Sequence, residues 1–306
     1  MRITNHMLMT NTLNNLQNNL ASLQNAQNQM SSGKTVSEPS DNPVATSRIM
    51  TLNSSLAAQD RYNSNIGDAE NFLSISDTAL GSLSSSLQNI RNLMLQGGTD
   101  TTTADDRAAI GEQVDQIISQ MVEDGNSMNG SQYMFGGYST SSQPLTRNGD
   151  AITYNGDGGQ IDYPLAQGVQ MSVNTDGNSL FQVSASAASS GPGNSDLFNT
   201  LIEIKNDLKS NTNVSDLTGT LLTKLDDISS QVLSLRSVVG AKTNRLDAAK
   251  SRNETDKTAM TTVLSSLQDV DVAQASVEYS EKSYVYQAAL ATAAKVLTPS
   301  LVDYLK

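Results

Sequence analysis

The amino-terminal segment combines helical periodicity with an almost complete absence of charge. Between Arg2 and Lys34 the sequence contains no Asp, Glu, Lys or Arg. Apolar side chains recur there at spacings of four and three residues, and Asn and Gln cover most of the remaining surface. The seam positions are Met9, Leu13, Leu16, Leu20, Leu23, Gln27 and Met30. This pattern predicts an amphipathic helix that ends at Gly33, with an apolar stripe that needs a partner to cover it.

Further helices are predicted on both sides of the middle of the chain. Asn42 is suited to be an N-cap and Pro43 to occupy the first helical turn, and the heptad pattern continues from there to Met94. Asp269 and Asp271 mark a helix boundary near the carboxyl end. The other predicted helices run from the N-cap Thr103 to Gly125, from Asp196 to about 210, from Leu217 to Leu267, and from Ala273 to Leu297.

The middle of the chain, residues 131–195, has a different pattern. Apolar residues alternate with period two around Ile152, Ile161 and Val169, which predicts short strands. The run Asn-Gly-Asp-Gly-Gly at 155–159 predicts a hairpin between the first two of these strands. The Ser, Ala, Gly and Pro residues at 184–194 predict a linker out of this part.

These patterns predict an α+β fold in which the two ends of the chain return to one another. The amino- and carboxyl-terminal segments would form a long antiparallel helical bundle or coiled coil, with a small β-rich domain inserted between them. The predicted domains are 1–42 with 270–306, a terminal helical domain; 43–130 with 196–269, a long helical bundle; and 131–195, the β-rich domain. Polar seam residues at Gln27, Gln59, Asn63 and Ser76 either fix the helix register or are tolerated on a half-wet bundle.

Composition and charge exclude several classes of function. Hydrophobic residues make up only 37% of the chain, which argues against a compact enzyme with a thick core. The net charge of −12 and the absence of any block of Lys and Arg leave no surface for nucleic acid or for an anionic membrane. No cysteine is present, and we expect neither a cleaved secretory signal nor a membrane span. The protein would either stay inside the cell or leave it by a route without a cleaved signal.

Candidate chemical sites are weak. Lys34-Thr35 resembles the end of a phosphate-binding loop, but position 28 is Asn28 instead of the required glycine. His6 is the only histidine, so it has no partner for a His/Cys metal cluster. Asp269 and Asp271 lack the spacing of a calcium loop and are better explained as charges at a helix start. We therefore predict no catalytic residue, no metal site and no cofactor, and expect that the chain is not an enzyme.

Seven segments stand out along the chain: Leu13 to Met30 followed by Ser31-Ser-Gly-Lys34, Glu38-Pro-Ser-Asp-Asn-Pro-Val-Ala45, Gln132-Tyr-Met-Phe-Gly-Gly137, residues 151–181, Asp269-Val-Asp-Val-Ala273, Tyr284-Val-Tyr-Gln-Ala288 and Leu297-Thr-Pro-Ser-Leu-Val-Asp-Tyr-Leu305. In this order they resemble the flagellin superfamily of bacterial flagellar axial proteins, and within it the hook–filament junction family, hook-associated protein 3. Met134 stands where that family usually has Leu or Ile.

The resemblance implies a structural adaptor of the bacterial flagellum. Copies of such a protein assemble with one another into a thin ring. The ring lies between hook-associated protein 1 on the hook side and the flagellin filament. Its terminal helices line the inner tube, and they order when neighbouring subunits supply the missing half of their core. The resemblance also implies uncleaved secretion through the flagellar type III export apparatus, with an export chaperone shielding the carboxyl-terminal helix.

The residues expected at these contacts lie on the two terminal helices. The assembly interface is predicted to comprise Leu13, Leu16, Leu20, Leu23, Met30, Val285, Ala288, Leu290, Val296, Leu297, Leu301 and Leu305. Chaperone contacts are predicted at Tyr284, Tyr286, Leu290 and Leu297. Two alternatives stay open: flagellin itself, the filament subunit, and a secreted binding protein whose β domain holds a ligand.

Overall fold

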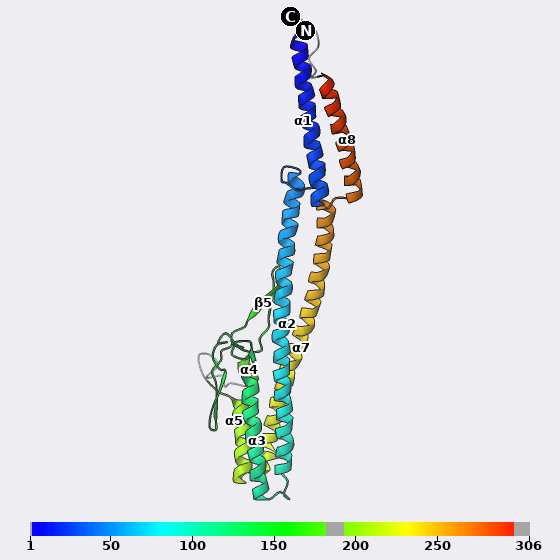
Figure 1. The fold of residues 1–306 in the computed structure, drawn as a ribbon. Helices are drawn as coiled ribbons and strands as arrows, with labels where there is room; N and C mark the ends of the chain where they lie inside the picture. The colour runs from blue at the N-terminus through cyan, green and yellow to red at the C-terminus, as the bar shows by residue number, and fades with distance from the viewer. Residues whose placement is uncertain (1, 182–192, 297–306) are drawn as a thin grey trace. The chain divides into compact units, whose positions relative to one another are not determined.

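Long helices dominate the computed structural model, which describes residues 2–181 and 193–296 (Figure 1). Each long helix predicted from the heptad pattern is present, with boundaries within a few residues of those expected. The helices are α1 (Arg2–Ser32), α2 (Pro43–Gly97), α3 (Ala104–Gly125), α4 (Gly177–Phe181), α5 (Asp196–Ser210), α6 (Val214–Leu217), α7 (Thr220–Gln268) and α8 (Val272–Val296).

Local capping explains where the helices begin and end. The Asn42 side-chain oxygen accepts a hydrogen bond from the Ala45 N–H at 3.0 Å, and Thr103 accepts one from the Asp106 N–H at 3.2 Å. Both residues are the N-caps that the sequence predicts. Gly33 follows α1 with φ of 68°, the left-handed conformation that commonly ends helices. Asp271 caps α8 by accepting from two backbone N–H groups.

The chain packs as two units. The terminal unit comprises Met1–Ala58 with Thr255–Lys306, and the central unit comprises Gln59–Glu254. In the terminal unit α1 and α8 lie side by side in antiparallel directions, because the end of α1 meets the start of α8 (Figure 1). Antiparallel helices built from both ends of the chain, with a small β-rich insert, confirm the predicted fold class. The predicted domain boundaries remain a prediction.

The central unit has a continuous apolar core. Its long helices α2 and α7 are antiparallel, and ion pairs join them from Arg91 to Asp226 at 2.8 Å and from Lys250 to Glu70 at 2.9 Å. The largest fully buried side chains are Tyr154, Phe135, Phe181, Phe198, Ile66, Leu73, Leu80, Leu83, Leu87, Ile90, Met94 and Ile118. Helices α2, α3 and α5 and the insert all contribute to this set, so the insert shares the core of the helices.

The insert consists of short antiparallel strands. β1 and β2 form one pair, β3, β4 and β7 form a three-stranded sheet, and β5 and β6 form a second pair. The strands are β1 (Met128–Asn129), β2 (Gln132–Tyr133), β3 (Leu145–Asn148), β4 (Ala151–Tyr154), β5 (Asp162–Ala166), β6 (Val169–Ser172) and β7 (Gly193–Asn194). The predicted linker at 184–194 lies largely outside the described residues.

One predicted hairpin is wrong. The 155–159 run does not pair β4 with β5; β4 instead pairs with β3 across Gly149, and β5 pairs with β6 across Gly168. The reason is a contact between residues distant in sequence. The Asp157 carboxylate accepts hydrogen bonds from the N–H groups of Tyr138 at 2.7 Å and Gly159 at 2.9 Å. These bonds fasten the run to the start of the insert, so it does not turn β5 back along β4.

The Tyr133–Gly137 segment forms the inner corner of the insert. Phe135 is fully buried, and its carbonyl oxygen accepts a hydrogen bond from the Tyr154 hydroxyl at 2.7 Å. Burial raises the pKa of Tyr154 well above its ordinary value, so the hydroxyl stays protonated and acts as a donor. Phe181 lies edge-on to Phe135 with ring centroids 6.2 Å apart. The two glycines of the segment therefore serve a turn, as expected from the sequence, and Gly137 has φ of 69°.

Candidate assembly surface

The seam between α1 and α8 is thin. Among the described side chains of these helices only three are buried, and all three are alanines: Ala26, Ala275 and Ala293, with 7%, 4% and 4% of their surface exposed. An alanine buries little apolar surface, and burial stabilises at roughly 25 cal/mol per Å². The contact between α1 and α8 therefore buries little apolar surface, and none of the large apolar side chains described on these helices is fully buried by it.

The large apolar side chains of α1 and α8 remain exposed to water. On α1, Leu13, Leu20 and Met30 of the predicted interface are exposed, whereas Leu16 and Leu23 are half-buried beside α8. On α8, Val285, Ala288 and Leu290 are exposed. Val296 is the last residue of α8, and Leu297, Leu301 and Leu305 lie outside the described residues. The structure therefore places most of the predicted interface residues at the surface of the terminal unit.

The predicted chaperone residues form part of the same surface. Tyr284 is 75% exposed and Leu290 is exposed, while Tyr286 is half-buried and Leu297 lies outside the described residues. Sequence reasoning missed other exposed apolar residues on these two helices: Met7, Leu8, Val272 and Val277. They do not belong to the heptad seam, and their signal is only the general shortage of charge around them.

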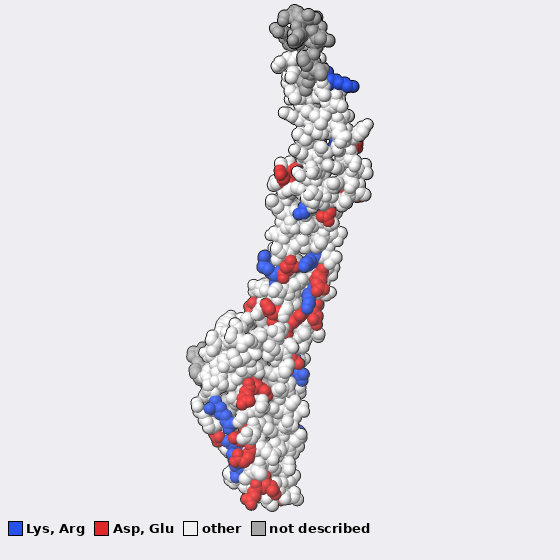
Figure 2. Space-filling model, viewed as in Figure 1, with Lys and Arg blue, Asp and Glu red and all other residues white. Residues whose placement is uncertain are grey.

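Charge is sparse on this surface. In Figure 2, few red or blue side chains lie over α1, in contrast with the central unit. The charges of α8 are confined to Glu278, Glu281, Lys282 and Lys295. Neutral amides cost less to bury than charges, and they hydrogen-bond readily to one another. A surface of leucine, methionine, asparagine and glutamine is therefore suited to burial against other helices.

The two connections that bring α1 and α8 together are bound to each other. The Gly33 carbonyl accepts from the Val270 N–H at 3.0 Å, and the Thr35 N–H donates to the Gln268 carbonyl at 2.7 Å. The Thr35 hydroxyl also donates to the Asp269 carbonyl at 3.1 Å. Lys34 and Thr35 thus make a strand-like bridge to the α7–α8 connection, which leaves no phosphate-binding geometry at that point.

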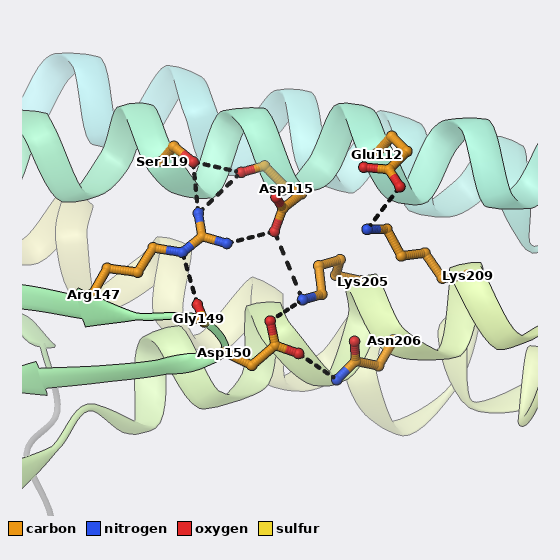
Figure 3. A network of polar contacts seen from close by, with 9 residues as sticks. All are labelled: Glu112, Asp115, Ser119, Arg147, Gly149, Asp150, Lys205, Asn206 and Lys209. Carbon is orange, nitrogen blue, oxygen red and sulfur yellow. Dashed lines mark hydrogen bonds and ion pairs between the residues drawn. The ribbon is translucent and has the colours of Figure 1, made fainter.

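A polar network of the central unit joins α3, α5, β3 and the β3–β4 turn (Figure 3). Arg147 donates to Asp115 and Ser119 at 2.6 Å each, and Lys205 bonds to Asp150 and lies 3.7 Å from Asp115. Lys205 lowers the pKa of the Asp150 carboxyl by donating to it. Both cations are thus paired with carboxylates, and we interpret the network as a structural lock between the insert and the helices.

The described residues contain no group of three His, Asp or Glu residues placed to hold a metal ion. Within the same ranges, none of the helices is both long and apolar enough to cross a membrane. The exposed apolar surface of α1 and α8 is therefore the strongest candidate for a functional site.

Known protein families match both ends of the chain. The bacterial flagellin N-terminal helical region matches residues 3–140, and the bacterial flagellin C-terminal helical region matches residues 222–305. Together these matches cover well over half of the chain. The chain belongs to the flagellin superfamily.

Individual relatives narrow the comparison within this superfamily. Flagellar hook-associated protein 3 of Salmonella typhimurium is 24% identical over 286 residues, which cover 89% of each chain. Flagellin of Clostridium tyrobutyricum is 28% identical over 120 residues, 39% of this chain and 32% of the relative. The flagellar junction protein FlgL from Legionella pneumophila has a similar fold, with a TM-score of 0.59 and 16% identity over 72% of this chain and 99% of that one.

As a member of the flagellin superfamily with hook-associated relatives, the chain is a structural protein of the bacterial flagellum and not an enzyme. The superfamily resemblance now has physical explanations. The segments around Gly33 and Asp269 meet in the bridge between α1 and α8. The segment around Phe135 forms the buried corner of the insert. These motifs therefore stabilise the folds of the two units, and the candidate assembly surface lies on α1 and α8 outside them.

Proposed function

We propose that this protein is the hook–filament junction subunit of the flagellum, which joins hook-associated protein 1 to the flagellin filament. The exposed apolar surface of α1 and α8, combined with their alanine-lined seam, supports this proposal most directly. The two helices bury alanines such as Ala26 and Ala275 but leave Leu13, Leu20 and Leu290 exposed. A stable monomer has no use for such a surface, whereas a ring of subunits buries it between neighbours.

Assembly would supply the stability that the isolated terminal unit lacks. Full burial of a leucine contributes about 1.5–3 kcal/mol, so a few such residues per subunit offset the cost of ordering the helices. Because the amino-terminal helix carries almost no charge, this burial needs no compensating ion pairs. The proposed mechanism is therefore ordering of the terminal helices on packing against the same helices of neighbouring subunits, of hook-associated protein 1 and of flagellin.

The same surface has to be protected before assembly. We propose that a flagellar export chaperone covers α8 through Tyr284, Tyr286 and Leu290, with Leu297 in the segment beyond. Tyr284 supports this role because it is the most exposed aromatic side chain of α8, with an apolar ring and a polar hydroxyl, a combination common in protein interfaces. The proposal includes secretion through the flagellar export route and a final position at the junction.

A complementation experiment in a strain that lacks the gene tests the proposal. We expect wild type to restore motility, whereas Leu13→Ser with Leu20→Ser leaves cells that shed monomeric flagellin. Both leucines are exposed, so the purified double variant should fold as wild type does. Asn14→Ser, an exposed polar change on the same helix, is the matched control and should restore motility. Full motility with the double leucine variant would contradict the assembly role of this surface.

Flagellin itself remains a second candidate, because flagellin regions match both ends of the chain and a flagellin is 28% identical over 120 residues. The relative with the longer match, over 89% of the chain, is a hook-associated protein. Immunogold labelling separates the two functions. Label confined to one point at the base of the filament supports the junction, and label along the whole filament supports flagellin.

A further inference from the structure

The β5–β6 hairpin contacts both long helices of the central unit. The Asn65 amide of α2 donates to the Pro164 carbonyl at 3.0 Å, and the Asn253 amide of α7 donates to the Leu165 carbonyl at 3.0 Å. Consecutive carbonyl groups of one strand therefore bind two different helices. In Figure 1 the strand β5 lies alongside α2, part-way along that helix.

A bulge in the hairpin prepares it for this contact. Pro164 pairs with Gln170 and Ala166 with Val169, so Leu165 is the extra residue without a partner in the ladder. A bulge residue leaves its backbone groups free and redirects its side chain. The Leu165 side chain is almost fully buried in the shared core, and its carbonyl oxygen is free to accept from Asn253.

Asn253 occupies a position where the helix pattern calls for an apolar residue. It follows Val232, Val239 and Leu246 at intervals of seven, and each of those side chains is buried. Asn253 itself is only 3% exposed. A buried amide in a heptad seam costs stability unless its hydrogen bonds are made, and here the hairpin accepts one of them.

A third contact holds the base of the hairpin, the end opposite its Gly168 turn. The Lys242 ammonium group of α7 donates to the Asn174 carbonyl at 3.1 Å. Asn174 also closes the base of the hairpin, because its side chain accepts from the Ile161 N–H and donates to the Gly159 carbonyl. The Lys242 ammonium group is partly removed from water at this contact, and this burial lowers its pKa.

We propose that the β5–β6 hairpin is a strap: through its hydrogen bonds to Asn65 of α2 and to Asn253 of α7 it holds the two helices in register. This part of the insert would then stabilise the helical pair. The helices need such support in this region. Buried polar atoms of Gln59, Asn63 and Ser76 on α2 have no hydrogen-bond partner within the described residues. The α2 seam thus carries polar side chains at three heptad positions of this region, and the strap adds contacts between the hairpin and both helices there.

The substitution Asn253→Leu tests the proposal, because the strap decides whether amide hydrogen exchange becomes slower or faster. If Asn253 were only a tolerated polar residue, leucine would complete the heptad and slow amide hydrogen exchange in α7. If the strap holds the pair, leucine leaves the buried Leu165 carbonyl unsatisfied. We then expect exchange to accelerate about tenfold or more in β5, in α2 around 63–70 and in α7 around 242–254. The exposed change Asn244→Ala on α7 is the control and should alter nothing.

Helix register can be measured independently, because the chain contains no cysteine and a pair of cysteine-attached spin labels can be introduced at two chosen positions. Spin labels at Ser64 and Asp247 report on the strapped region, and labels at Ser85 and Ser230 report on the pair beyond it. We expect Asn253→Leu to broaden the first distance distribution and to leave the second unchanged. Slower exchange with an unchanged distance, or faster exchange within the hairpin alone, would overturn the proposal.

A milder variant covers the case in which Asn253→Leu does not fold. Asn65→Ala removes a single hydrogen bond at an exposed position, so the protein should remain folded. We expect about threefold faster exchange in α2 around 63–70 together with β5, because the loss of one exposed hydrogen bond is small. Unchanged exchange in α2 of this variant would also refute the strap.

Discussion

The two units of the molecule use the same kind of sequence pattern in opposite ways. In the central unit the heptad leucines such as Leu80 and Leu87 are fully buried by α3, α5, α7 and the insert. In the terminal unit heptad leucines such as Leu13 and Leu20 remain exposed, and the only buried residues among the described side chains of α1 and α8 are alanines. A heptad pattern therefore predicts that an apolar stripe will be buried. Whether a single chain can bury it depends on how many helices and strands pack against that stripe.

The largest test of this comparison is a pair of matched truncations, one in each unit. Leu87→Ala should cost about 2–5 kcal/mol of unfolding free energy, because it opens a cavity in a filled core. Leu20→Ala should change the stability of the isolated protein by less than about 0.5 kcal/mol, because that side chain is exposed. Urea unfolding followed by circular dichroism measures both. Equal losses in the two variants would show that the terminal unit has a core of its own.

A second test concerns how the central unit closes its end. Arg107 is buried and donates to the carbonyls of Gly97 and Thr99 and to the side chain of Asn211. Arg107→Lys keeps the charge but lacks the planar fork that reaches three acceptors, so we expect a loss of about 2 kcal/mol. Arg91→Lys, which alters an ion pair at the surface, is the control and should cost much less, because solvent screens that pair. A thermal melt with equal midpoints for the two variants would contradict this role.

Local features of the sequence predicted most of the fold. Asn42 and Thr103 cap their helices through atoms only three residues away, so their effect is encoded in neighbouring residues. The hairpin at 155–159 failed because its outcome depends on Tyr138, which is distant in sequence. The turn that does join two strands, at Asn148-Gly149, carries the same dipeptide signal. Two equal local signals cannot be ranked without the tertiary contact that selects one.

The candidate site was predictable to a similar extent. The charge-free stripe predicts that α1 needs a partner, and in the structure several of its large apolar side chains are exposed. The sequence does not distinguish Leu16 and Leu23, which lie toward α8, from Leu13 and Leu20, which do not. That distinction depends on which face of α1 lies against α8, and therefore on the packing of the two helices. The periodicity of α1 alone does not show which part of its apolar stripe α8 will cover.

A smaller effect is expected where the insert is locked to the helices. Lys205→Met removes the buried cation between Asp150 and Asp115. It should lower the unfolding free energy by only about 1 kcal/mol at pH 7, because Asp150 is largely exposed and water screens the ion pair. Lys205 lowers the pKa of Asp150, so the stabilisation is present above the ordinary Asp value of about 3.9 and is lost as the pH falls below it.

Urea unfolding of both proteins at pH 7 and pH 3 measures this dependence. We expect the difference between wild type and Lys205→Met to shrink at the lower pH. The exposed pair of Lys224 with Glu203, at 3.4 Å, offers a control in Lys224→Met, for which the loss at pH 7 should be smaller. A penalty for Lys205→Met that is constant with pH would assign its effect to packing of the lysine stem instead of to the ion pair.

The smallest effect concerns a charge that the central unit buries at a cost, a feature absent from the nearly charge-free α1. Asp124 lies in the last turn of α3, where burial raises the pKa of its carboxyl and the helix dipole is unfavourable to an anion. A raised folded-state pKa means that stability is lost as the pH rises through it, so Asp124→Asn should stabilise the protein at pH 7 by less than about 1 kcal/mol. The new amide oxygen can still accept from Gln120.

The opposite end of the same helix provides the control for this last substitution. Asp105 lies in the first turn of α3, where a negative charge is favourable, so Asp105→Asn should destabilise the protein by a few tenths of a kcal/mol. Both variants remove one charge from a protein of net charge −12, so general relief of repulsion contributes alike to each. Opposite signs in chemical denaturation would assign the effects to position along α3. A gain in both variants would instead assign them to net charge, and the cost of burial at Asp124 would then be negligible.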